Sequence, residues 1–512
     1  MTASDLNHTY DSEEFRRQGH ELIDILADYL REAASRSDMP VLRDVEPDDL
    51  VREFAFDNPA NRDLPLSSFI RKVIANMNHM HHPRFVGHQN TPPLTAGIIA
   101  QMCTTLLNNG VAVYEMGPAS MAAERNVIRY MARLIGFNEA ADGIFTHGGS
   151  AGNLTALLAA RQAMSDYNIW EEGVRHDRPV GIIISDQSHY SVSRNARVIG
   201  LGGGSVIRIP YDSRYAMQTR LLRETMAKAE EKGIRVICVA ANACSTATGT
   251  YDNLEEIGAF CRENNLWFHV DGAHGLGVLF SDKYRHLVRG IEHADSVVLD
   301  FHKMLLTPGL NTMVLFRDGQ RSYETFAQKA GYLFDRQDEN EWYNGAKRTL
   351  ECTKSALGIV AWAVIRYYGE EALGKYVESR YDIASRFADA IRAEDGMELA
   401  VTPESNIVCF RYAPAGCSSG RLNELNRMIR KKMANPYREY SILFSGRNSV
   451  TRKGIIPPIV NAAPEANAAW IGFAWLISFI PSSSLICAPN ASLDINSFAT
   501  VRAVSLCRPL FS

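Results

Sequence analysis

Three side chains suited to catalysis stand at or just after short apolar runs of the sequence. Lys303 follows the run SVVLDF, Asp271 lies within WFHVDG, and His189 comes after GIIIS. A lysine so placed extends to water, pairs with an anion or acts as a nucleophile. A buried carboxylate needs a partner, because an unpaired buried charge is costly. Taken singly, each residue also fits a structural role: a surface lysine, a helix-capping aspartate or a hydrogen-bonded histidine.

A glycine-rich segment, THGGSAGNLTALLAAR (146–161), follows a further apolar run, GIF. Gly148 and Gly149 let the backbone approach an anion closely, and Ser150 is expected to cap the helix that follows. The free N–H groups and the positive dipole end at such a helix start bind phosphate. The alternative interpretation is a tight strand–helix turn without a ligand.

The elements that must position these groups are short β-branched runs that alternate with helical stretches from about 85 to 320. The runs are 181–185, 205–210, 236–241, 267–272, 296–301 and 312–316. Such a pattern predicts an α/β fold with a mostly parallel sheet flanked by helices. Ligands bind at the carboxyl ends of such strands. We therefore expect the anion site, the histidine, the acid and the lysine to meet at one edge.

Four further predictions concern individual helices. Residues 12–35 form an amphipathic pattern that Ser12 can cap, whereas 39–62, rich in Pro and Asp, are expected to be an extended arm. A helix is predicted over 213–232, ending at Gly233. Asp252 and Glu255 have the spacing of a capping box at the start of a helix over 252–264. Residues 352–395 look helical, and a strand signal follows within 397–412.

One cofactor, pyridoxal phosphate, needs all of these parts: an anion site, a stacking face, a counter-ion for its ring nitrogen and an amine for its aldehyde. The motifs also resemble the group II pyridoxal-phosphate-dependent amino-acid decarboxylases, which include the aromatic amino-acid, glutamate and 2,4-diaminobutyrate decarboxylases. The resemblance runs from about His82 to Lys354, more than half of the chain. The matching segments are HHPRFVGH with PPL (81–94), NNGVAVYEMGPASMAAER (108–125), HGGSAGNL, DQSHYS, STATGTYDNL (245–254), HVDGAHG, the DFHK run and GAKRTLECTKS (345–355).

The resemblance implies the roles of individual residues in the decarboxylation of an L-amino acid to its amine and CO₂. The catalytic residues would be Lys303, which carries the cofactor, Asp271, which pairs with the ring nitrogen, and His189, which stacks on the ring. The other cofactor-binding positions would be Gly149, Ser150 and His302 on the phosphate side, Thr246 near the ring hydroxyl and Ala273 against the ring. A tyrosine on the loop 331–348, either Tyr332 or Tyr343, would handle a proton.

The resemblance further implies fold type I, the aspartate-aminotransferase type, assembled as a homodimer. The expected domains are an N-terminal helical arm (1–80), a large cofactor-binding domain (81–350), a small C-terminal α/β domain (351–450) and an atypical tail (451–512). From Gly454 onward charges are scarce, and nothing after Arg447 matches the family's C-terminal pattern. A weakly active homologue is therefore an alternative, as is an aminotransferase or aldehyde synthase on the same scaffold.

The composition of the chain is that of an ordinary globular protein. The 512 residues carry a net charge of −4, so nothing indicates a nucleic-acid or anionic-membrane partner. The nine cysteines include no CxxC pair, which predicts reduced thiols in a cytoplasmic enzyme. The longest apolar run, near 468–480, is too short to span a bilayer.

Readings from other functional classes are less well supported. A nucleotide-binding dehydrogenase that uses GLGGGS (200–205) is not supported, because this run precedes a strand instead of joining a strand to a helix. A metal hydrolase is a further alternative, with the histidines at 79, 81, 82 and 88 as ligands. These histidines do not have the HExxH spacing, so no metal site is expected. A non-catalytic scaffold is the remaining alternative.

Overall fold

The computed structural model describes residues 11–35, 39–326, 341–433, 442–443 and 473–476. The chain divides into two compact units. The larger unit consists of Gln89–Arg411 with Ala474–Ile477, and the smaller unit is drawn from both ends of the chain. The four domains expected from the sequence stay a prediction. Apart from one short strand, the atypical tail lies outside the described residues.

A seven-stranded sheet forms the centre of the larger unit, in the order β2-β8-β7-β6-β5-β3-β4. The strands are β2 Asp142–Thr146, β3 Val180–Ser185, β4 Val206–Ile209, β5 Arg235–Asn242, β6 Trp267–Asp271, β7 Ser296–Asp300 and β8 Thr312–Phe316. Strand β8 is antiparallel to both of its neighbours, while the other adjacent pairs are parallel. The predicted runs and the mostly parallel α/β sheet are thus confirmed.

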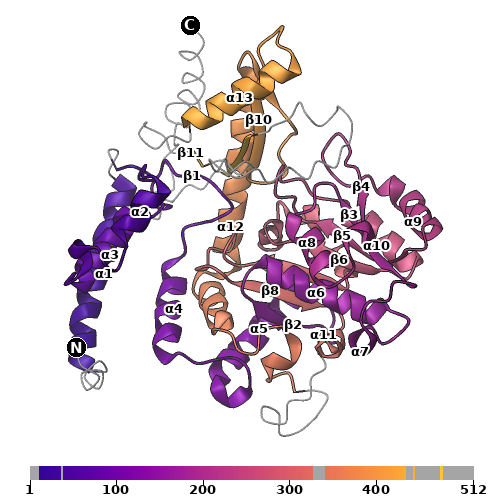
Figure 1. The fold of residues 1–512 in the computed structure, drawn as a ribbon, viewed down its shortest axis with the longest axis horizontal. Helices are drawn as coiled ribbons and strands as arrows, with labels where there is room; N and C mark the ends of the chain where they lie inside the picture. Colours follow the sequence, from indigo (N-terminus) through magenta and orange to yellow (C-terminus); the bar gives the residue numbers. More distant parts are fainter. Residues whose placement is uncertain (1–10, 36–38, 327–340, 434–441, 444–472, 477–512) are drawn as a thin grey trace. The chain divides into compact units, whose positions relative to one another are not determined.

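Side chains of the sheet alternate between two apolar cores, one on each face. In β7, for example, Val297 and Leu299 belong to one core, and Val298 belongs to the other. The helices over the first face are α5 Pro118–Ile135, α9 Leu222–Glu231, α10 Leu254–Glu263 and α12 Leu357–Ala393. The helices over the second face are α6 Gly149–Met164 and α8 Tyr190–Val198, and α6 crosses the strands in Figure 1. Burial on both faces explains the nearly continuous apolar strands.

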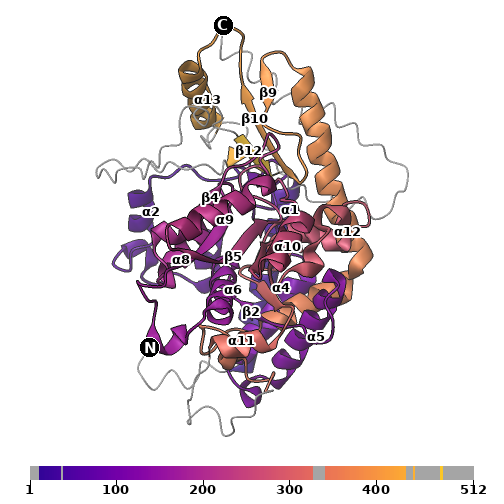
Figure 2. The same ribbon diagram turned by 90° about the vertical axis from the view of Figure 1, so that its right-hand side faces the viewer.

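Helix α12 leads from the large sheet to a three-stranded sheet of order β12-β10-β9. These strands are β9 Met397–Leu399, β10 Ile407–Tyr412 and β12 Phe473–Leu476. Figure 2 shows α12 as a long rod that reaches β9 and β10. The rod is interrupted at Gly369, whose φ of 74° is non-helical. The remaining α-helices in the described part of the larger unit are α4 Thr95–Leu107, α7 Ile169–Glu172 and α11 Gln320–Thr325.

The smaller unit contains α1 Ser12–Ser35, α2 Pro47–Glu53, α3 Leu66–Ala75 and α13 Ser419–Met433, with β1 Val86–Gly87 paired in parallel with β11 Ile442–Leu443. The predicted helix 12–35 is confirmed. Its predicted cap is wrong, because the Asp11 carboxylate accepts from the backbone N–H groups of Glu13 and Glu14 at 2.8 and 3.0 Å. The extended arm over 39–62 is also wrong, since Pro47 starts α2 at a position where proline favours helix.

The sequence placed three helix starts of the larger unit too early. The helix predicted over 352–395 is α12, which begins at Leu357. Helix α9 begins at Leu222 instead of 213, because Met217 is buried in a β-bridge with Tyr211. Asn253, and not Asp252, caps α10, because its side chain accepts from the backbone N–H of Glu256 at 3.2 Å.

Candidate active site

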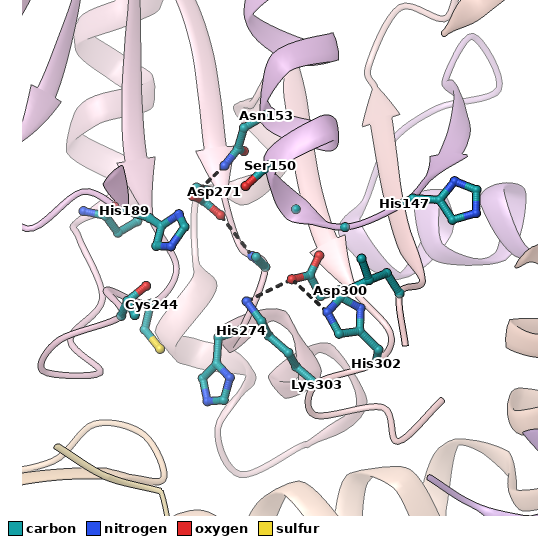
Figure 3. Close-up of a pocket in the computed structure, with 16 residues that line it drawn as sticks. His147, Ser150, Asn153, His189, Cys244, Asp271, His274, Asp300, His302 and Lys303 are labelled. Carbon is teal, nitrogen blue, oxygen red and sulfur yellow. Dashed lines mark hydrogen bonds and ion pairs between the residues drawn. The ribbon is translucent and has the colours of Figure 1, made fainter. Parts of the chain in front are cut away.

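A cavity of about 240 Å³ lies at the carboxyl ends of β2, β3, β5, β6 and β7. Every cofactor-binding position that the sequence singled out lines this cavity: Gly149, Ser150, His189, Thr246, Asp271, Ala273, His302 and Lys303. Figure 3 shows His189, Asp271 and Lys303 gathered from the ends of separate strands, with Ser150 from the start of α6. Segments more than 150 residues apart in sequence are brought together because parallel strands end at the same edge.

The amine of Lys303 lies in an acidic environment. Lys303 occupies the turn after β7, and its Nζ is 2.9 Å from Oδ2 of Asp300. Asp300 is buried and also accepts a hydrogen bond from Thr312 Oγ1 at 2.5 Å. Burial by itself lowers the pKa of Lys303, but Asp300 and then Asp271 outweigh it and raise that pKa above its ordinary value. The structure therefore holds this amine as an ammonium.

The Asp271 carboxylate ends β6 and is held by two donors. Its Oδ2 accepts from Nδ2 of Asn153 at 2.9 Å, and its Oδ1 accepts from the backbone N–H of Ala273 at 3.3 Å. Asp271 is buried yet lines the cavity. Such a carboxylate can pair with a cationic group that enters the cavity.

His189 stands at the start of α8 and caps it. Its Nδ1 accepts from the backbone N–H of Ser191 at 3.3 Å and lies 2.7 Å from the Ser191 hydroxyl. Burial lowers the pKa of His189, against the opposing effect of Asp271. At neutral pH a neutral, apolar ring face can therefore meet an aromatic ligand.

The glycine-rich segment turns sharply into α6, which begins at Gly149. Gly148 precedes it with a φ of 91°, a conformation that favours glycine. The predicted Ser150 cap is wrong, because Ser150 already lies inside the first turn, where its carbonyl accepts from Asn195 Nδ2 at 2.8 Å. A Cβ built on Gly149 would lie 3.1 Å from both carboxylate oxygens of Asp300. Glycine here keeps open a cradle at the helix start, as an anion site requires.

Several cavity residues were missed by sequence reasoning, among them Asn153, Asp300 and His274. Asn153 stands four residues after Gly149, a helical spacing that was a usable signal for one face of α6. His274 is buried; its Nε2 lies 2.8 Å from Asn406 Oδ1, while its Nδ1 has no partner. Burial, and then Lys303, lower the pKa of His274 to about 4. No local sequence pattern predicts the contact with Asn406, because this residue lies 132 residues from His274 in sequence.

The two candidate tyrosines are not placed at the cavity by the structure. Tyr332 lies outside the described residues. The ring of Tyr343 instead contacts the rings of Tyr114 and Trp342, at centroid distances of 5.6 and 5.7 Å.

A family model described as the pyridoxal-dependent decarboxylase conserved domain matches residues 47–413. The chain belongs to this decarboxylase family. It is 28% identical over 434 residues to the aromatic-L-amino-acid decarboxylase of Bacillus atrophaeus. This match covers 84% of this chain and 88% of that protein. It is 30% identical over 390 residues to the L-aspartate decarboxylase dtxS4 of Metarhizium robertsii, which covers 75% and 77%.

The fold agrees with that membership. The crystal structure of mouse CSAD in apo form superposes with a TM-score of 0.80 at 23% identity, over 92% of this chain and 95% of that one. This decarboxylase thus has fold type I, and it is a pyridoxal-phosphate-dependent carboxy-lyase that acts on an amino acid. Over the described ranges, no helix combines the length and apolarity that crossing a membrane requires.

Proposed function

We propose that Lys303, Asp271 and His189 carry the chemistry of this decarboxylase, in the cavity at the carboxyl edge of the large sheet. The observation that carries the proposal is that one cavity holds an amine, a buried carboxylate and a glycine cradle at a helix start. These groups match, one for one, the aldehyde, the ring nitrogen and the phosphate of pyridoxal phosphate. The residues present therefore fit the cofactor.

Each residue has a distinct task in this proposal. Bound pyridoxal phosphate supplies an aldehyde for an amine and a cationic ring that withdraws electrons as CO₂ leaves. The carboxylate of Asp271 keeps a proton on the ring nitrogen, and the backbone at Gly149 and Ser150 binds the phosphate. His189 presents its ring as a stacking face. Asp300, 2.9 Å from Lys303, is placed to take the proton that the Lys303 ammonium must lose before Nζ acts as a nucleophile.

Replacing the lysine tests the proposal directly. The Lys303→Ala variant is expected to lack the visible absorption band that borohydride removes from the loaded enzyme, and to lose all turnover, because among the residues that the structure describes Lys303 supplies the one amine in the cavity lining. The matched control is Lys283→Ala, which removes an exposed lysine paired with Asp382 and should keep both band and turnover. A reducible band in Lys303→Ala would refute the assignment.

We also propose that this decarboxylase is a cytoplasmic homodimer. Helix α4 exposes a group of large apolar side chains that are 40–65% accessible: Ile99, Met102, Leu106 and Leu107. A helix face with several exposed large apolar side chains is typical of an interaction surface, and a second copy of the chain is the expected partner. The substrate side chain is assigned by measuring CO₂ release from a panel of aromatic, acidic and diamino L-amino acids.

A further inference from the structure

A buried chain of side-chain hydrogen bonds runs behind the Asp271 carboxylate. It begins at the Trp267 indole, whose Nε1 donates to Ser296 Oγ at 2.8 Å. Ser296 Oγ lies 2.9 Å from Nδ1 of His269, and Nε2 of His269 lies 3.0 Å from Oδ1 of Asn153. Asn153 then donates to Asp271. The three middle members of the chain are each no more than 1% exposed, so water does not substitute for any of these contacts.

The same asparagine also reaches the second proposed catalytic group. Its Nδ2 donates to Ser191 Oγ at 3.1 Å, and Ser191 Oγ lies 2.7 Å from Nδ1 of His189. Asn153 therefore stands at a branch point, with one arm to the carboxylate and one arm to the stacking histidine. Figure 3 shows Asn153 above Asp271, directed at its carboxylate.

The donors and acceptors allow one arrangement of protons. A carboxylate only accepts, so the NH₂ group of Asn153 faces Asp271 and its Oδ1 faces His269. Nε2 of His269 must then carry a hydrogen. The Trp267 indole only donates, so the Ser296 hydroxyl accepts from it and donates a hydrogen bond to Nδ1 of His269. His269 is thereby fixed as the neutral tautomer with its proton on Nε2.

The same reasoning sets the tautomer of His189. Both amide hydrogens of Asn153 are used, on Asp271 and on Ser191. The Ser191 hydroxyl accepts a hydrogen bond from one of them and donates its own hydrogen bond to Nδ1 of His189. That nitrogen already accepts from the Ser191 backbone N–H, so the ring proton of His189 is on Nε2.

We propose that His269 is a positioning residue that fixes the Asn153 amide, and through it both the Asp271 carboxylate and the tautomer of His189. The inference rests on the proposed roles of those two residues. Burial lowers the pKa of His269 to about 4, which keeps the ring neutral at pH 7. A ring without the Nε2 hydrogen leaves Oδ1 of Asn153 without a donor. The hydrogen bond that fixes the orientation of the amide is then lost.

Two variants of His269 separate positioning from simple packing. In His269→Gln the terminal amide N–H reaches the position of Nε2 and can donate to Asn153. In His269→Asn the amide is one carbon shorter and replaces only the Nδ1 side. The readouts are the visible circular dichroism of the bound cofactor, the rate of cofactor loss on dialysis, and kcat and KM measured separately.

For His269→Asn we expect the visible ellipticity per unit absorbance to fall at least two-fold, cofactor loss to become about ten-fold faster and kcat to fall with little change in KM. His269→Gln should restore the ellipticity to near that of the parent enzyme. Equal losses in the two variants, or an unchanged ellipticity in His269→Asn, would overturn the inference.

A milder variant keeps the test informative if His269→Asn does not fold. Ser296→Ala removes the hydroxyl that sets the tautomer of His269 and should shift the ellipticity in the same direction by a smaller amount; no shift contradicts the inference. Asp271→Ala distinguishes a failure of the proposed role of Asp271 from a failure of the proposed role of His269. If it leaves the ellipticity unchanged, the proposed role of Asp271 fails; if it alters the signal while both His269→Asn and Ser296→Ala do not, only the inference fails.

Discussion

The Asp300 carboxylate lies beside the helix start that we propose as the phosphate site. Its Oδ2 is 2.9 Å from Lys303 Nζ, and both of its oxygens lie against the first residue of α6, Gly149. A phosphate bound at that helix start and the carboxylate would be two anions side by side in a poorly solvated site, where like charges repel by several kcal/mol. In the proposed site, Asp300 would therefore oppose the phosphate while it holds Lys303 charged.

Asp300→Asn tests that opposition. Because a neutral amide removes the repulsion and lowers the pKa of Lys303, we expect the Kd for pyridoxal phosphate to fall about ten-fold at pH 7. The affinity for pyridoxal, which lacks the phosphate, should increase less in this variant. Both dissociation constants come from titration of the visible band. An equal gain for the two ligands would show that the phosphate does not meet Asp300.

At the scale of single elements, apolar patterns located the strands well, whereas several helix starts depended on distant partners. Strands β3 to β8 were found from their apolar runs alone, because burial on both faces of all but the edge strand β4 leaves little choice of residue. The start of α10 was misassigned because Asp252 is used elsewhere. Its carboxylate accepts from the backbone N–H groups of Met217 and Asn242, both at 2.7 Å. Nothing near Asp252 in the sequence reveals these contacts.

The candidate site shows the same division. Lys303, Asp271 and His189 were found because each lies at or just beyond a strand end, whereas Asn153 and His269 were not. Asn153 faces inward from helix α6 and His269 from strand β6. In the sequence, each looks like an isolated polar residue within an apolar segment. Their connection to the proposed site is seen only through hydrogen bonds to partners more than 100 residues away in sequence.

Helix α6 supplies a prediction at the scale of an element. In Gly149→Ala the added Cβ would stand 3.1 Å from the Asp300 oxygens and 3.4 Å from Ala273 Cβ, and would fill the cradle. We expect the Kd for pyridoxal phosphate to rise about ten-fold, with a smaller effect on unfolding temperature. The control is Gly204→Ala, whose Cβ meets nothing within 4 Å. Unchanged cofactor affinity in Gly149→Ala would place the phosphate elsewhere.

For the whole molecule, buried histidines predict how stability depends on pH. His269 and His274 have pKa values of about 4 in the folded chain, against about 6.5 when unfolded. The unfolded state therefore binds more protons between those values, and stability is lost as pH falls from 6.5 towards 4. Each histidine contributes a loss of roughly 3 kcal/mol by pH 4. Asp252, whose pKa burial raises to about 6, opposes this trend.

The slope of stability against pH measures this effect. In cofactor-free enzyme, His274→Asn should reduce the slope between pH 4.5 and 6 by up to about 1.4 kcal/mol per pH unit. Denaturant unfolding at several pH values gives the slope. The exposed residue His176, changed to Asn, is the control. A slope in His274→Asn equal to that of the parent would contradict the predicted coupling.

Assembly gives the second prediction for the whole molecule. Two charges introduced on α4, in Leu106→Glu with Leu107→Glu, should halve the mass measured by analytical ultracentrifugation, because charged side chains are not tolerated in an apolar interface. Val198→Glu, at another exposed apolar position, should leave the mass unchanged. A parent enzyme that sediments as a monomer would reject the dimer itself.

The proposed anchor lysine lies in the connection between β7 and β8, two strands held together by register pairs from Ser296 with Phe316 to Asp300 with Thr312. This hairpin is flanked by β6 on one side and β2 on the other, so it is internal to the sheet. Releasing the turn requires separating central strands, which open only when the whole unit unfolds. With excess cofactor present, the visible band of the bound cofactor should therefore report global unfolding. It should persist while peripheral segments fray, and it should be lost when the most protected amide protons exchange.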